Sequence, residues 1–336
     1  MSGERRTLRG NPVVAAPGKL FVIGEYAVLA GAPAVVAAVN RYAVGQFVIG
    51  LAPESDFTRQ AVAAGLRGLG DRAEAMPPGS VLIDSTSFRA GGKKLGLGSS
   101  AAVTVVAVAA VMEMAGMSVA EHRALCFELA DGAHRSAQGG VGSGADVAAA
   151  VHGGLIRYRR GRPGEAGGQG PGPRVATLVK PAALRLVVFS EGSPASTPDL
   201  IRIVEAYAAR RPAAYERLML QLEDRCETFI EAIAGANLEV AISVAIDYAA
   251  GLAELGAQAG APIITPRFEL AADLATNLGG MAKPSGAGGG DLGIGMFGEP
   301  EAAQSFAARL EELGLRVLDV DLDLNGVHRR LPASNL

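Results

Sequence analysis

The 336-residue chain has no tryptophan, only two cysteines and few aromatic residues, which make up 5% of it. Its lysines and arginines number 31 against 34 aspartates and glutamates, so it lacks an excess of positive charge, and we expect no nucleic-acid partner. The cysteines, Cys126 and Cys226, stand in helical patterns without metal-ligand spacing, which argues against a disulfide scaffold or a zinc site. These features favour a reducing compartment, and we expect a cytoplasmic protein.

Long apolar segments are also lacking. The most apolar stretch, residues 101–112, is about a dozen residues long, short of the ~20 that a helix needs to span a bilayer. The opening ten residues, MSGERRTLRG, lack the apolar core of a secretory signal. We therefore expect no export by that route and no membrane partner. Because 49% of the residues are hydrophobic and 19% are charged, the composition is that of a globular protein.

Glycine, in contrast, is abundant, with 45 residues. Glycine weakens helices and strands, and it is needed where the backbone turns sharply or closely approaches a ligand. Three clusters stand out: GLG at 96–98, GGVGSG at 139–144 and GAGGG at 286–290. These clusters mark the segments that are most informative about function.

The spacing of apolar residues predicts a mixed α+β fold. In the first half we expect several strands within 11–50, with breaks at 17–18, 31–33 and 40–41, a strand over 81–84, and helices over 53–76, 101–114 and 119–137. In the second half we expect strands over 184–189, 292–297 and 316–320, and helices from Thr197 and over 213–234, 238–257 and 301–313. This alternation suggests a ferredoxin-like arrangement. For the low-complexity segment 159–174 we expect an exposed loop.

The first candidate motif is the loop Gly96-Leu97-Gly98-Ser99-Ser100-Ala101, which directly precedes the most apolar predicted helix. Its backbone N–H groups would lie at a helix N-terminus, where the helix dipole favours an anion, and phosphate is the natural occupant. The loop lacks the Lys-Ser/Thr ending of a P-loop, so that nucleotide site is not indicated. A structural alternative is that a serine merely caps the helix.

Two further segments place charged residues among apolar residues or glycines. In PGKLFVIGEYAVL, residues 17–29, Lys19 must reach solvent, an acid or a bound anion, because a buried lysine without a partner is costly. A surface lysine at a strand end is the alternative. In KPSGAGGGD, residues 283–291, four glycines in five positions favour close approach of the chain to a ligand.

With these three segments in order, the chain resembles the GHMP kinases, a superfamily of small-molecule kinases, along nearly its whole length. Tyr26, the stretch AQGGVGSGADVAAA at 137–150 and SPAST at 193–197 resemble the phosphomevalonate kinases within it. The resemblance implies an N-terminal lobe like ribosomal protein S5 domain 2 and a C-terminal ferredoxin-like lobe, with the active site between them. We expect an ATP-binding N-terminal domain over 1–183 and a C-terminal domain over 184–336.

The resemblance also implies an ATP- and Mg²⁺-dependent phosphorylation of 5-phosphomevalonate to 5-diphosphomevalonate, a step in isoprenoid precursor synthesis. Lys19 would lie beside the acceptor, and Asp146 would act as a base or as an electrostatic orienter. The loop residues Gly96, Leu97, Gly98, Ser99, Ser100 and Ala101 would wrap the ATP phosphates, with Ser99 or Ser100 on the metal. The predicted substrate-binding residues are Lys19, Tyr26, Ser143, Gly144, Ser193, Ser196, Thr197, Ser285, Gly286, Ala287 and Gly288.

Several alternatives stay open at this point. A mevalonate kinase or another small-alcohol GHMP kinase would use the same residues on a hydroxyl acceptor, and a catalytically inactive GHMP fold would bind a metabolite as a sensor. Asp146 by itself can also be interpreted as a helix N-cap. Mevalonate kinases place a metal-binding glutamate shortly before this aspartate, but residues 133–138 contain none, so the second metal contact is not assigned. A homodimer is also open.

Three other polar residues are interpreted as structural. His134 and His152 are single histidines of a kind that is more often hydrogen-bonded in a core or at a surface than catalytic. Thr197 precedes Pro198, which is typical of a helix that starts with threonine as N-cap and proline as first residue. A substrate contact of the segment 193–197 would be additional to that role.

Overall fold

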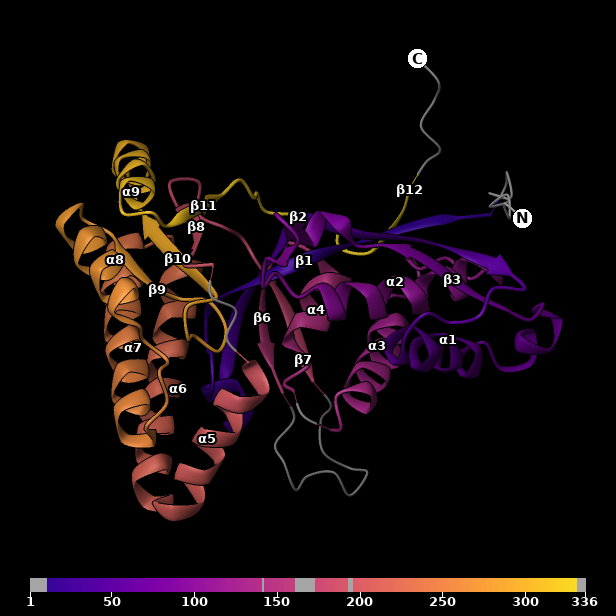
Figure 1. Cartoon of the computed structure of the whole chain (residues 1–336), viewed down its shortest axis with the longest axis horizontal. Coiled ribbons are helices and arrows are strands. Elements are labelled where there is room, and N and C mark those ends of the chain that lie inside the picture. The colour runs from indigo at the N-terminus through magenta and orange to yellow at the C-terminus, as the bar shows by residue number, and fades with distance from the viewer. Residues whose placement is uncertain (1–10, 141, 161–172, 193–195, 331–336) are drawn as a thin grey trace.

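The computed structural model describes residues 11–140, 142–160, 173–192 and 196–330, which form two lobes that pack against each other (Figure 1). The first lobe has an antiparallel sheet in the order β12-β1-β2-β6-β7, with β3 also paired to β2. Its strands are β1 (Val13–Ile23), β2 (Pro33–Ile49), β3 (Gly79–Asp84), β6 (Leu155–Arg159), β7 (Arg174–Leu178) and β12 (His328–Arg330). A small hairpin of β4 (Arg89–Ala90) and β5 (Lys93–Lys94) lies outside this sheet.

The helices of the first lobe gather on one side of its sheet (Figure 1). They are α1 (Asp56–Gly68), α2 (Ser99–Met114), α3 (Arg123–Ala137) and α4 (Ala145–His152), with short 3-10 turns at Ala27–Ala30, Gly70–Ala75 and Thr86–Phe88. Helix α2 is the core of this layer, since every residue from Thr104 to Met112 is buried. Its lack of charge before Glu113 is therefore explained by burial on all sides.

The second lobe is built on a four-stranded antiparallel sheet in the order β11-β8-β10-β9. Its strands are β8 (Arg185–Ser190), β9 (Met281–Pro284), β10 (Leu292–Phe297) and β11 (Arg316–Leu318). Its helices are α5 (Thr197–Arg210), α6 (Pro212–Ala234), α7 (Leu238–Ala259), α8 (Pro266–Asn277) and α9 (Pro300–Glu312). Numbered along the chain, these strands lie in the order 4-1-3-2 with helices between the first and second and between the third and fourth, which confirms the predicted ferredoxin-like lobe.

The expectation of several short strands within residues 11–50 was wrong. The region forms two long strands, and the pairing shifts from Pro17 opposite Tyr42 to Gly18 opposite Val39. The two turn signals, Pro17-Gly18 and Asn40-Arg41, thus face each other across one ladder. They form a single bulge, which bends a long hairpin without ending either strand.

Other boundaries differ in smaller ways from the predicted ones. Helix α3 begins at Arg123, four residues later than expected, and the helix expected over 53–76 ends at Gly68, before a 3-10 turn. The elements α8, β6, β7, β9 and β12 were not predicted. Ser196, not Thr197, is the N-cap of α5. Most of the predicted exposed loop, residues 161–172, lies outside the described residues, and Arg159 pairs with Arg174 on either side of it.

The two lobes share one core. The largest cluster of buried apolar side chains includes Leu20 of β1 and Val105 of α2 as well as Phe229 of α6 and Tyr248 of α7. At the surface, the Arg157 guanidinium of β6 donates to both carboxylate oxygens of Glu227 on α6, at 2.8 and 3.0 Å. A large apolar interface of this kind favours a fixed relative position of the lobes.

The last described strand returns to the first lobe. β12 pairs with β1, with Val13 opposite Arg330, and Leu322 forms a bridge to Val39 of β2. Residues beyond β11 therefore complete the sheet of the N-terminal lobe. The domain boundary at residues 183 and 184 stays a prediction, to which the structure adds this returning segment.

Residues 101–112 lie in the buried helix α2, but a longer apolar helix, α7, lies in the second lobe. By length and composition α7 is the one helix among the described residues that could cross a membrane. Core helices pass the same test, and Tyr248, Leu252 and Leu255 of α7 are fully buried in the protein. Cys126 and Cys226 are buried free thiols. The cytoplasmic location and the lack of membrane and nucleic-acid partners stay predictions from the sequence. The question of a homodimer stays open.

Candidate active site

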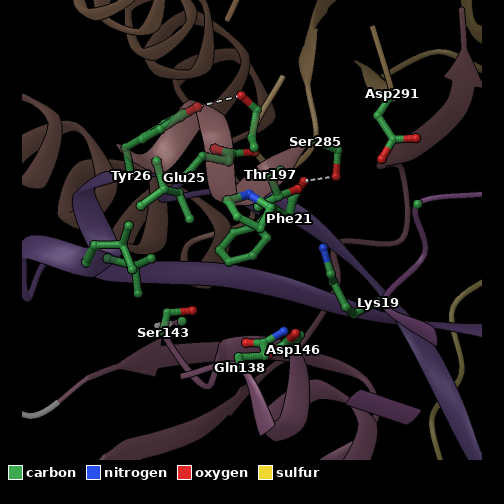
Figure 2. Close-up of a pocket in the computed structure, with 18 of the residues that line it drawn as sticks. Lys19, Phe21, Glu25, Tyr26, Gln138, Ser143, Asp146, Thr197, Ser285 and Asp291 are labelled. Atoms are coloured by element: carbon green, nitrogen blue, oxygen red, sulfur yellow. Dashed lines mark hydrogen bonds between the residues drawn. The ribbon is translucent and has the colours of Figure 1, made fainter. Parts of the chain in front are cut away.

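A cavity of about 480 Å³ lies between the two lobes, within the usual range for small-molecule sites. Ten of the predicted site residues line it, namely Lys19, Tyr26, Gly96, Ser143, Asp146, Thr197, Ser285, Gly286, Ala287 and Gly288. Figure 2 shows Lys19 reaching into the opening, with Ser143 and Asp146 along one side and Tyr26 and Ser285 along the other. All three glycine clusters thus contribute to one site.

The first glycine loop ends in the first turn of α2. Gly98 is the N-cap of α2, with a left-handed φ of 77°, and no side chain caps the helix, so the alternative of a serine N-cap was wrong. Leu97 and Ala101 are buried, and of this loop only Gly96 lines the cavity. Strand β1 holds this loop, because Lys19 N donates to Leu97 O at 2.9 Å.

A side chain at Gly98 tests the role of this loop. A Cβ there would lie 2.8 Å from Cγ of Lys19, and its positive φ is strained for any other residue by about 1–3 kcal/mol. We expect Gly98→Val to raise KM for Mg-ATP by about tenfold, with less effect on KM for the acceptor, in steady-state kinetics with each substrate varied. Gly132→Ala is the control, since a Cβ at Gly132 of α3 would meet nothing within 4 Å. A folded Gly98→Val with an unaltered KM for ATP would show that the loop does not hold phosphate.

Lys19 supplies the positive charge of the cavity. Its ammonium group makes no ion pair with any other described residue and lies 5.1 Å from the centre of the Phe21 ring. The carboxylate of Asp291 also lines the cavity. Burial raises the pKa of Asp291, and the charge of Lys19 opposes this effect. An unpaired ammonium in a partly closed cavity is suited to bind an anion.

Asp146 lies in the first turn of α4, on the side of the cavity opposite Ser285 (Figure 2). Gly144 is the N-cap of α4, so the interpretation of Asp146 as N-cap was wrong. The backbone N–H of Val147 donates to Oδ1 of Asp146 at 3.0 Å. The preceding turn is held by the buried Tyr158, whose hydroxyl donates to Ser143 O at 2.5 Å. The carboxylate is thereby fixed at the edge of the cavity.

Tyr26 joins segment 17–29 to the third glycine cluster. Its hydroxyl donates to Ala287 O at 2.6 Å, and Ser285 Oγ donates to Phe21 O at 2.9 Å (Figure 2). Tyr26 has a left-handed φ of 61°, a strained conformation for a non-glycine residue, which these contacts maintain. Because its hydroxyl proton is donated to Ala287 O, Tyr26 can contact a substrate mainly through its ring.

A buried ion pair lies at the cavity wall, of which Glu25 is a part. Lys283 of β9 and Glu25, which follows β1, are 0% and 1% exposed and form a salt bridge across the lobes. Lys283 also donates to Pro284 O at 2.9 Å and lies over the ring of Tyr248. Burial lowers the pKa of Lys283, and the Glu25 carboxylate opposes this shift. The pair therefore fixes segment 283–291 against segment 17–29.

Removal of one partner would leave a buried charge uncompensated. We expect Lys283→Met to lower the free energy of unfolding by about 3–5 kcal/mol, measured by urea denaturation. The double variant Glu25→Leu/Lys283→Met should recover most of this loss, because it buries no charge. A loss below about 1 kcal/mol in Lys283→Met would contradict a stabilising interlobe pair.

The remaining predicted residues do not line the cavity or are not described. Gly144 and Ser196 do not line it, and neither do Leu97, Gly98, Ser99, Ser100 and Ala101, whereas Ser193 lies outside the described residues. Eleven lining residues were not predicted, namely Phe21, Glu25, Val28, Leu29, Phe57, Ala137, Gln138, Gly142, Pro198, Ile201 and Asp291. Asp291 had a signal, since it directly ends the third glycine cluster. Within residues 133–138, where a metal-binding glutamate was sought, Gln138 reaches the cavity.

Comparisons with known proteins show which family the chain resembles. Residues 72–154 match the family model described as the GHMP kinases N terminal domain. The chain is 30% identical to a phosphomevalonate kinase from a Streptomyces species, over 97% of this chain and 100% of that protein. The similarity therefore extends through both lobes.

Solved structures show the same fold. A Listeria innocua protein is similar with a TM-score of 0.85 at 28% identity, over 95% of this chain and 99% of that one. The Streptococcus pneumoniae phosphomevalonate kinase in complex with phosphomevalonate and AMPPNP has a TM-score of 0.80 at 22% identity, over 92% of this chain and 99% of that one. These similarities confirm the predicted two-lobed GHMP kinase fold.

Proposed function

Because the chain belongs to the phosphomevalonate kinase family of the GHMP kinases, we propose that it transfers the γ-phosphoryl group of ATP to 5-phosphomevalonate. An oxygen of the acceptor phosphate forms a bond to the γ-phosphorus, and the bond from that phosphorus to the bridging oxygen of ADP breaks. The products are 5-diphosphomevalonate and ADP. The protein needs to align these two oxygens and to stabilise negative charge.

The residues of this chain can divide that work. The backbone N–H groups of the Gly96–Ala101 loop, at the N-terminus of α2, hold the ATP phosphates. Lys19 stands between the acceptor phosphate and the transferred group and stabilises charge on both. Asp146 orients Lys19 or the acceptor, and it accepts a proton when the acceptor oxygen carries one. The start of α5, at Ser196 and Thr197, provides a second site for an acceptor anion.

Magnesium fits the oxygen donors that the chain offers here. Among the described residues no group of three or more His, Cys, Asp and Glu side chains could hold a metal. Mg²⁺ in kinases is commonly held by one or two protein oxygens together with substrate phosphates and water. Ser99, Ser100 and Asp146 are the residues that would hold it. When bound, the ion neutralises charge on the ATP phosphates.

The unpaired ammonium group of Lys19 is the observation that carries this proposal. A phosphate acceptor brings a second multiply charged anion next to the triphosphate of ATP, and their repulsion in a partly closed cavity requires a cation. Lys19 lies in the cavity without an acidic ion-pair partner among the described residues. It is therefore available to that acceptor.

A substrate panel tests the proposal. Mevalonate, 5-phosphomevalonate, homoserine and galactose are compared under saturating Mg-ATP by release of ADP. We expect kcat/KM to be highest for 5-phosphomevalonate. If mevalonate is phosphorylated at least as efficiently, the chain is a mevalonate kinase, and if no acceptor stimulates ADP release, the inactive-sensor alternative is favoured.

A further inference from the structure

A buried histidine contacts one of the predicted metal-binding serines. His134 of α3 is 3% exposed, and its Nε2 atom lies 3.2 Å from Oγ of Ser100 in the first turn of α2. Phe57 of α1 packs against the imidazole ring, with ring centroids 5.6 Å apart. Phe57 in turn lines the cavity. Two helices therefore fix a histidine that the sequence alone did not connect with the site.

The Ser100 hydroxyl neither caps α2 nor bonds to a backbone group of the described residues. A serine in the first turn of a helix commonly caps it or bonds to a nearby backbone group. Here Gly98 is the N-cap, without any side-chain cap, and the Ser100 carbonyl accepts from the Thr104 hydroxyl at 2.9 Å. Across the part of the chain that the structure describes, His134 is the one hydrogen-bond partner of Ser100 Oγ.

We propose that His134 is a positioning residue that turns the Ser100 hydroxyl toward the Mg²⁺-ATP complex, an inference that rests on the proposed kinase function. With its proton on Nδ1, the imidazole accepts a hydrogen bond at Nε2 from the Ser100 hydroxyl. The free lone pair of Oγ then faces away from the ring, as a serine requires to contact a cation or its bound water. Removal of a group that orients a metal ligand typically weakens metal affinity by about 10- to 100-fold.

Nucleotide binding tests this proposal without turnover. Titration calorimetry gives the dissociation constant of ADP at saturating Mg²⁺ and again in EDTA. For His134→Leu we expect the constant with Mg²⁺ to rise about tenfold and the constant in EDTA to change by less than about twofold. His134→Gln, whose amide can take the place of Nε2, should recover most of the Mg²⁺-dependent affinity.

A double-mutant cycle decides whether His134 acts through the serine. If it does, His134→Leu/Ser100→Ala binds Mg-ADP no more weakly than Ser100→Ala alone, because no hydroxyl is left to orient. Additive losses overturn the proposal, as does unchanged Mg-ADP binding in His134→Leu. His152→Leu is the matched control, since His152 also packs on a phenylalanine of the same lobe, Phe127, at 5.8 Å.

Thermal unfolding of each variant separates loss of orientation from loss of fold. If His134→Leu does not fold, His134→Asn takes its place in the cycle, because its shorter amide does not reach Ser100. A parent protein that binds ADP equally with Mg²⁺ and with EDTA also overturns the inference. Failure of the proposed function is distinguishable, because it appears as missing turnover in the substrate panel while the binding cycle still reports on His134.

Discussion

Replacement of Lys19 by methionine is expected to lower kcat by about 10²- to 10³-fold and to raise KM for 5-phosphomevalonate. The first effect follows from the loss of a fixed positive charge at the transferred phosphoryl group, where a single donor contributes that much. The second follows because the same charge-assisted contact binds the acceptor phosphate in the ground state. Methionine keeps most of the side-chain volume, so the Cγ that packs against Gly98 remains.

Steady-state kinetics with each substrate varied separate these two effects. Lys94→Met provides a control, since Lys94 is an exposed residue of β5. A reduced kcat with an unchanged KM for 5-phosphomevalonate would restrict Lys19 to the transition state. A kcat within threefold of the parent would remove Lys19 from the reaction altogether.

The second large effect is expected at Asp146. Asp146→Asn should lower kcat by at least about 100-fold if the carboxylate accepts a proton, with little change in the melting temperature. A phosphate acceptor is largely ionised near neutral pH, so the need for a base is smaller than with an alcohol. A loss of only about tenfold would therefore favour a role in orienting Lys19 or Mg²⁺.

Single-turnover rates under saturating substrates isolate this effect from product release. Asp56→Asn is the matched control, because Asp56 also lies in the first turn of a helix but pairs with Arg59 at the surface. If Asp146→Asn retains more than a third of the parent rate, neither role for the carboxylate is correct.

Local sequence patterns were sufficient to predict the helices and strands that consist of one continuous apolar run. The apolar runs of α2, β8 and β10 are buried over most of their length, so a continuous run identifies them. The bulge between β1 and β2 was not predictable in the same way. Proline, glycine and asparagine there are turn residues by local rules, and only the pairing of the two strands turns both signals into one bend.

The glycine clusters identified the site because each is confined to a position where the backbone meets the cavity or a helix start. Gly286 illustrates this, since it lines the cavity at a φ of 109° and has open space where a Cβ would lie. The partners across the lobes could not be predicted, since Tyr26 and Ala287 are 261 positions apart. Local spacing carries no information about contacts of that separation.

His134 and Lys283 show why residue type alone was insufficient. A lone histidine in a helix has an ordinary structural explanation, and only the approach of α2 to α3 gives it a serine partner. Lys283 was noted only as the start of a glycine segment. Its burial depends on Glu25 from the other lobe, which no pattern around residue 283 reveals.

The return of β12 to the first sheet constrains the order in which the protein can be completed during synthesis. A ribosome releases β1 before the second lobe and β12 only after every element of that lobe. Until then one side of β1 has no strand beside it, and unpaired strand edges are prone to pair with other chains. The N-terminal lobe can thus acquire this edge strand only after the second lobe has been synthesised, so this lobe cannot mature independently of the one that follows it.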